Sequence, residues 1–249
     1  MTNGSTRRRA LSFGFLHSDS SHVGLRASTH PTIDRSCRRA VQNLHAVNVH
    51  ETPDACENPF CSRRIRPGAL PFQFPEGDDA ARLVDRLASN GWWGQIVGPH
   101  GSGKSALLAA LTPVIEQTGR DTRLIELHDG QRRLPLSLGS DARVSASTML
   151  LVDGYEQLGR MSRFRLKRTC RRHAAGLLVT AHAPVGLPDL FRTSPELELA
   201  LDIVGKLTHG YESCVNSRDV AQRFSRHGGN LREMLFDLYD VYEQRRGEE

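Results

Sequence analysis

Several features are scarce in this chain, and each scarcity excludes a class of protein. No stretch of the 249 residues approaches the ~18 uninterrupted apolar residues of a membrane-spanning helix. The apolar stretch 10–16 is broken by Ser12 and Gly14, and it is too short for the core of a secretory signal peptide. We therefore expect a cytoplasmic protein without membrane contact.

Cysteine is also scarce, with five scattered residues at Cys37, Cys56, Cys61, Cys170 and Cys214. A disulfide-stabilised secreted domain carries a denser and even-numbered set. Cys56 and Cys61 form the one close pair, but neither a second cysteine pair nor a nearby histidine pair completes a zinc site. Reduced, unpaired cysteines are the expectation.

Lysine occurs three times, at Lys104, Lys167 and Lys206, and none stands in the [NT]KxD motif with which a GTPase recognises guanine. Basic charge is concentrated at the start of the chain. Residues 1–66 contain ten arginines against five acidic residues, whereas the remainder carries 23 basic and 23 acidic residues. The pI of about 9.2 therefore reflects the N-terminal segment, and it does not by itself indicate nucleic-acid binding by a folded domain.

The hydrophobic pattern divides the chain into three regions. Residues 1–57 lack periodicity and are rich in Ser, His, Arg and Asn, which predicts a disordered basic segment; a tail that touches nucleic acid is the alternative. Residues 58–200 are expected to form an α/β domain, because short apolar runs alternate with helical patterns. Residues 201–249 are expected to form a small helical lid.

Apolar runs at 122–129, 147–154 and 175–182 are too continuous for half-buried strands, which predicts a mostly parallel sheet covered on both faces. The run 187–194 is expected to add an edge strand.

Helices are predicted between and after these strands. Apolar residues at i, i+3, i+4 and i+7 favour a helix over 80–87, and a second helix is expected from 104 until Pro113. A charged helix is expected over 157–174. Two more flank the Gly-Gly break near the C-terminus, and the second begins at Asn230, which forms a capping-box pattern with Glu233.

The stretch 98–105, GPHGSGKS, fits the Walker A pattern G-x-x-x-x-G-K-[ST] without a mismatch, after a strand and at a helix start. Backbone N–H groups of such a loop, together with the helix N-terminus, bind phosphates. Lys104 can reach the β- and γ-phosphates, and Ser105 can ligate Mg²⁺. We expect ATP to be bound by Gly98, Pro99, His100, Gly101, Ser102, Gly103, Lys104, Ser105 and Ala106.

A Walker B strand is predicted where four apolar residues, 149–152, end in Asp153, whose carboxylate would hold the Mg²⁺ beside Ser105. Glu156 is the nearest candidate for orienting the attacking water, although it follows the aspartate by three residues; a solvated acid at a helix start is the alternative. The strand over 175–182 ends in polar residues, so Thr180 or His182 is a candidate sensor of the γ-phosphate.

These motifs, with Gly229-Asn230-Leu231-Arg232 near the C-terminus, resemble AAA+ ATPases of the initiator (ORC-like) and transposition-helper kinds over residues 70–245. The resemblance implies a P-loop NTPase three-layer fold with a C-terminal lid, and it implies that Arg232 contacts the γ-phosphate as sensor 2. The chain departs from the family pattern in lacking a glutamate directly after Asp153. No obvious arginine finger is present, and Arg192 is the best candidate by position.

No acidic residue occurs over 157–188. The stretch 160–172 contains seven basic residues, which are Arg160, Arg163, Arg165, Lys167, Arg168, Arg171 and Arg172. Positions 160, 163, 167 and 171 are expected to share one helix face. Contact with nucleic acid, an acidic protein or a neighbouring subunit is one interpretation, and an ordinary solvated helix face is the other.

The motifs together predict an ATPase that binds ATP and Mg²⁺ and couples slow hydrolysis to conformational change, self-association or a macromolecular partner. A non-hydrolysing nucleotide switch and a small-molecule or polynucleotide kinase are the alternatives. An ABC ATPase is disfavoured because LSGGQ is missing between the two Walker motifs. A helix-turn-helix DNA reader in the C-terminal helices ranks below these.

Overall fold

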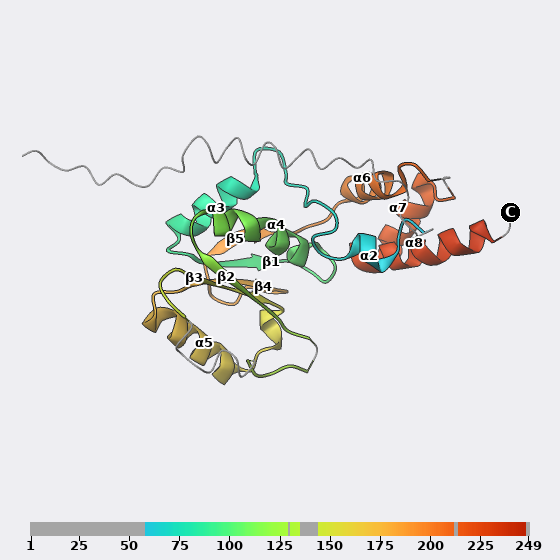
Figure 1. Ribbon diagram of the computed structural model, residues 1–249. Coiled ribbons are helices and arrows are strands. Elements are labelled where there is room, and N and C mark those ends of the chain that lie inside the picture. Colours follow the sequence, from blue (N-terminus) through green and yellow to red (C-terminus); the bar gives the residue numbers. More distant parts are fainter. Residues whose placement is uncertain (1–57, 129, 135–143, 212–213, 248–249) are drawn as a thin grey trace, which may run out of the picture.

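The computed structural model describes residues 58–128, 130–134, 144–211 and 214–247, which form two parts (Figure 1). One part is a β-sheet with helices on both faces, and the other is a group of helices beside it. The segment predicted to be disordered, residues 1–57, lies outside the described residues. Within the described ranges, no helix is both long and apolar enough to cross a membrane.

Five parallel strands form the sheet: β1 (Trp93–Val97), β2 (Asp121–Glu126), β3 (Thr148–Asp153), β4 (Gly176–Ala181) and β5 (Asp189–Arg192). Their order is β2-β3-β4-β1-β5, so β4 lies between β1 and β3, and β5 lies at an edge. The predicted parallel sheet and its edge strand are confirmed. Because all strands run the same way, Asp153 at the end of β3 and the residues that directly follow β1 and β4 meet at one edge of the sheet.

Helices cover both faces of the sheet. α3 (Ala80–Ser89) and α4 (Lys104–Gln117) lie on one face, and α5 (Arg160–Arg172) lies on the other (Figure 1). Along β3, Met149 and Leu151 pack with α3 and α4, whereas Leu150 and Val152 pack on the α5 side. A strand buried on both faces needs apolar residues at every position, which explains its unbroken run. The predicted three-layer α/β fold is confirmed.

Two helix boundaries differ from the prediction. α4 passes through Pro113 and ends at Gln117, because buried side chains on both sides of the proline hold the helix against the core and outweigh one missing hydrogen bond. The helix expected over 157–174 begins later, since a single 3₁₀ turn, η3 (Tyr155–Gln157), precedes α5.

The helical part consists of α6 (Leu197–Thr208), α7 (Ser217–Arg226) and α8 (Leu231–Arg246), with the short α2 (Ser62–Ile65) against them (Figure 1). Phe60 is fully buried in their shared core, so the chain next to α2 packs with the C-terminal helices. The sequence pattern did not predict α6, and the expected boundary at residues 200 and 201 falls inside it. The division into domains stays a prediction.

The cysteines follow the expectation in part. Cys170 and Cys214 are free thiols, whereas Cys61 is disulfide-bonded, so the prediction is wrong at Cys61. Cys37 and Cys56 lie outside the described residues. Burial raises the pKa of Cys170 to about 12, which keeps its thiol protonated and unreactive.

Candidate functional site

The loop 98–105 joins the end of β1 to α4 at the carboxyl edge of the sheet. Gly101 and Gly103 have φ angles of 64° and 90°, a region that glycine adopts at little cost. Gly98 is required by a close approach, because a Cβ there would lie 1.9 Å from Oγ1 of Thr193. That hydroxyl lies 2.5 Å from Oγ of Ser102, so the residue after β5 fixes the shape of the loop.

Lys104 is buried, and its Nζ donates to the carbonyl oxygens of Gly98 at 2.7 Å and Pro99 at 2.6 Å. Burial lowers the pKa of Lys104, while the nearby carboxylates of Glu156 and Asp153 act in the opposite direction. The ammonium group therefore lies among the loop and both acidic residues that the sequence predicts for the site.

Asp153 ends β3, and its Oδ1 accepts a hydrogen bond from the hydroxyl of Thr180 at the end of β4. The same hydroxyl accepts from the backbone N–H of Gly154 at 2.9 Å. Thr180 is fully buried, so its hydroxyl has both partners within the protein and holds the Asp153 carboxylate in one orientation.

Glu156 and His182 form a second pair, with Nε2 of His182 at 3.2 Å from Oε1 of Glu156. The other carboxylate oxygen of Glu156 is buried and has no hydrogen-bond partner among the described residues. The ring of His100, in the loop, contacts the His182 ring with centroids 3.6 Å apart and the two planes tilted by 52°. Three chain segments therefore converge beside Lys104.

The helical part of the molecule contacts the loop through the start of α8. The side chain of Asn230 accepts from the backbone N–H of Glu233 and thus caps the helix. A Cβ on Gly101 would lie 1.7 Å from Oδ1 of Asn230, which shows how closely the two segments approach. The guanidinium of Arg232 lies over the ring of Phe236, 5.8 Å from its centroid.

All these elements line one cavity of about 900 Å³, a volume typical of small-molecule sites. The predicted site residues that line it are His100, Gly101, Ser102, Gly103, Lys104, Ser105, Ala106, Asp153, Glu156, Thr180, His182 and Arg232. Gly98 and Pro99 do not line it and instead supply the carbonyl groups that bind Lys104. Arg192 lies outside the lining, exposed and paired with Asp189 at 2.6 Å.

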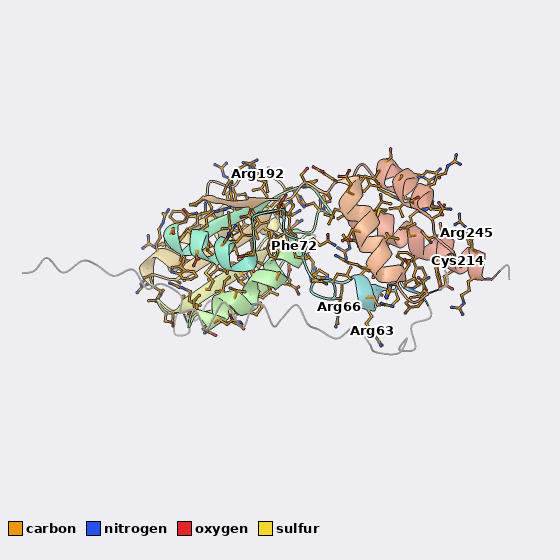
Figure 2. All side chains as sticks on the ribbon, turned by 90° about the horizontal axis from the view of Figure 1, so that it is seen from above. Arg63, Arg66, Phe72, Arg192, Cys214 and Arg245 are labelled. Carbon is orange, nitrogen blue, oxygen red and sulfur yellow. The ribbon has the colours of Figure 1, made fainter. Side chains whose placement is uncertain are left out.

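Several lining residues had no signal in the sequence pattern. Arg66 and Phe72 come from the segment between α2 and α3, and both lie between the two parts of the molecule (Figure 2). Leu199 and Ile203 come from α6, and Glu126 comes from the end of β2. Their contribution depends on packing between distant segments, which no local motif reports.

Magnesium is compatible with this donor set. Within the part of the chain that the structure describes, no three His, Cys, Asp or Glu side chains are arranged as a metal cluster. Mg²⁺ does not require one, since it is commonly held by one or two protein oxygens together with substrate phosphates and water. Ser105 and Asp153 line the same cavity and are the residues that would hold it.

In the sheet, β4 lies between β3, which ends in Asp153, and β1, which precedes the glycine-rich loop. Residues of α6 and α8 line the cavity from the helical part. This is the three-layer arrangement of a P-loop NTPase, as the Walker motifs predict.

Comparison with known proteins gives structural neighbours. No family model matches the chain, and no curated protein matches its sequence. AMPPCP-bound DnaA from Aquifex aeolicus is similar at 15% identity and a TM-score of 0.46, over 71% of this chain and 67% of that one. A DNA replication initiation factor is similar at 14% and 0.47, over 70% and 66%. A Walker-type ATPase of Pyrococcus abyssi is similar at 11% and 0.41, over 76% and 78%.

The chain thus spans about two thirds of the length of DnaA and of the initiation factor that it matches.

Proposed function

We propose that the protein is a cytoplasmic ATPase that binds ATP with Mg²⁺ and couples slow hydrolysis to a conformational change or to assembly. The observation that carries the proposal is the convergence of the Walker A loop, Asp153 and the start of α8 on one cavity. A phosphate-binding loop alone fits many nucleotide-binding proteins. A lid that contacts the loop adds an element whose position responds to the bound nucleotide.

The triphosphate is expected along the loop, where backbone N–H groups and the α4 N-terminus supply positive charge. Lys104 would exchange its bonds to Gly98 and Pro99 for bonds to the β- and γ-phosphates, which carry a full negative charge. Ser105 and Asp153 would hold Mg²⁺, and Thr180 would act by orienting Asp153. The metal would neutralise charge on the transferred phosphoryl group.

The nucleobase is expected in the apolar half of the cavity. That half is lined by side chains from α2 and the segment after it, from α6 and from α8, among them Ile65, Leu70, Phe72, Leu199, Ile203 and Leu235. A base placed there would bridge the α/β part and the lid. Nucleotide binding would thereby set the position of α8, and Arg232 would leave Phe236 to contact the γ-phosphate.

Hydrolysis also needs a carboxylate that accepts a proton from the attacking water. Glu156 lies in the cavity, as the proposal requires, but one of its oxygens is already engaged by His182. His182 remains the candidate for sensing the γ-phosphate, because it stands beside the loop through its contact with His100.

The test is ATP binding and phosphate release by the full chain, with Lys104→Ala compared with Lys206→Ala, a lysine on the exposed face of α6. Loss of Lys104 should weaken ATP binding roughly 10- to 100-fold, the value of a charged hydrogen-bonding partner. Lys206→Ala should bind ATP normally. Unchanged binding by Lys104→Ala would contradict the proposal.

The same assay separates the alternatives. A nucleotide-dependent switch would bind ATP without releasing phosphate, and a kinase would move the phosphate to an added acceptor rather than to water. Oligomer size, followed with and without nucleotide, reports self-association, for which Arg192 is the candidate finger toward a neighbouring subunit.

One observation favours nucleic acid as a partner. The outward side of α5 presents Arg160, Arg165, Arg168 and Arg172 together with Met161 and Phe164, which are 64% and 60% exposed. Arginines around an exposed aromatic ring suit single-stranded nucleic acid, where phosphates pair with the cations and a base stacks on the ring. Arg163 and Lys167, two of the residues expected to share one helix face, both lie over the ring of Tyr155, so the exposed arginines of α5 are on another side of the helix.

A further inference from the structure

Position 154, where a glutamate would directly follow the Walker B aspartate, has no room for one. Gly154 has a φ angle of 77°, and a Cβ there would lie 2.9 Å from the carbonyl oxygen of Leu127. Its N–H is also bound to Thr180. Only glycine fits at this position, because Leu127, which directly follows β2, leaves no space for a side chain. A carboxylate that activates water must therefore come from another segment.

The neighbouring strand β2 carries a carboxylate directly beside Asp153. Glu126, the last residue of β2, is the register partner of Asp153 in the parallel ladder. Neighbouring strands lie about 4.8 Å apart, whereas consecutive Cα atoms are about 3.8 Å apart. Glu126 therefore stands almost as close to Asp153 as the next residue in the sequence would.

Glu126 also faces the correct side of the sheet. Ile125 and Leu127, its neighbours in the sequence, pack on the α5 side. Because side chains alternate along a strand, Glu126 points to the opposite side, on which the loop and α4 lie. It lines the same cavity as Lys104 and Asp153, and its side chain is exposed.

Glu156 is less suited to accept a proton from water. Its Oε1 lies 3.2 Å from Nε2 of His182, and its Oε2 is buried. This carboxylate is paired with His182, the residue that the proposed function assigns to the γ-phosphate. Glu156 thus acts on His182 and leaves the water to another acid.

We propose that Glu126 is the general base of the ATPase, supplied across the sheet in place of the glutamate that Gly154 excludes. The inference rests on the proposed function. The water oxygen forms a bond to the γ-phosphorus while the bond from that phosphorus to the bridging oxygen breaks, and ADP leaves with the electron pair. The proton released by the water passes to Glu126 and from there to solvent.

The experiment compares Glu126→Gln, Glu156→Gln and the matched control Glu198→Gln, an exposed acid on α6 outside the cavity. Each full-length variant is assayed for steady-state phosphate release and for the affinity of ATP and ADP, with thermal unfolding as a check of the fold. Removal of a general base lowers kcat by roughly 10²- to 10⁴-fold. Glu126→Gln should show that loss with nucleotide affinities within about threefold of the unsubstituted protein, since the base acts on water rather than on binding.

Glu156→Gln should keep phosphate release within about tenfold, and Glu198→Gln should match the unsubstituted chain. Turnover retained in Glu126→Gln and abolished in Glu156→Gln would overturn the inference and leave the proposed ATPase intact. A protein that binds ATP and never releases phosphate would overturn both the base and hydrolysis. A chain that fails to bind ATP would refute the proposed function itself, and binding assays read that outcome separately.

Discussion

Asn230 of the lid lies directly on Gly101 of the phosphate-binding loop. A Cβ at position 101 would be 1.7 Å from Oδ1 of Asn230 and 3.2 Å from Cβ of Arg232. The two segments are separated by well over a hundred residues in the sequence, yet they meet without room for a methyl group. The loop and the start of α8 are therefore in direct contact, and the candidate sensor Arg232 is placed by the same contact.

Gly101→Ala should separate the lid from the loop. The methyl group must displace Asn230, so ATP affinity is expected to fall at least tenfold. Gly119→Ala is the matched control, because Gly119 also has a positive φ, of 84°, but has nothing within 4 Å of its would-be Cβ. Both variants pay the left-handed strain of about 1–2 kcal/mol in unfolding free energy. ATP titrations should show the loss in Gly101→Ala alone, and equal affinities would refute the coupling.

Thr180→Val should destabilise the protein and disturb Asp153. The substitution keeps the shape of the side chain but leaves a carboxylate oxygen of Asp153 and the N–H of Gly154 without their shared partner. The expected cost is about 1–3 kcal/mol of unfolding free energy. Thr180→Ser retains the hydroxyl and should recover most of it. Urea unfolding measures the cost, and a full loss in the serine variant would show that the methyl group, not the hydroxyl, matters.

The parts of the site that sequence reasoning reached are those that adjacent residues define. The loop around Lys104 and the strand end at Asp153 follow from local patterns, because turn geometry and strand polarity are set within a few residues. The pairing of Glu126 with Asp153 and the approach of Asn230 to Gly101 depend on register and on lid packing. Neither contact can be predicted from a short segment of the sequence.

Helix boundaries show the same limit. Pro113 reads locally as a helix end, but the buried core on both sides of it carries the helix onward. α6 was not predicted, because it is stabilised by packing against α8 and Phe60. Phe60 lies at the other end of the described chain, so this contact is not visible in the local sequence. Tertiary packing outweighs local preference at both places.

Acid should weaken the lid through Asp219. Its carboxylate accepts from Arg245 at 2.7 and 2.9 Å and from the N–H of Asn216 at 3.0 Å. The hydrogen bond from Arg245 is the main cause that lowers the pKa of Asp219, and burial opposes it. A folded-state pKa below the unfolded value of about 3.9 gives a stabilisation that is complete above that pH and lost as the pH falls further.

Asp219→Asn should therefore reduce the fall in unfolding free energy between pH 5 and pH 2, which urea titrations at each pH would measure. Asp85→Asn, at an exposed position on α3, serves as the control and should leave the pH dependence as it is. A slope unchanged by Asp219→Asn would show that other carboxylates, such as Asp237, carry the acid sensitivity.

Charge reversal on the outer side of α5 should weaken binding to single-stranded nucleic acid. Arg165→Glu with Arg168→Glu removes two cations beside Phe164, and Arg82→Glu with Arg218→Glu makes the same change in net charge at exposed positions on α3 and α7. If four arginines contact phosphates, the logarithm of the affinity should fall with the logarithm of salt concentration with a slope of about −3. The α5 pair should weaken the affinity of a labelled oligothymidylate at least tenfold and flatten that slope by about 1.4.

Phe164→Ala should weaken the affinity for the oligothymidylate roughly fivefold or more, because a stacked base is lost. Anisotropy titrations provide the measurement. Equal losses in both double variants would reduce the effect to net charge, and binding to polyglutamate in place of the oligonucleotide would identify the partner of α5 as an acidic protein.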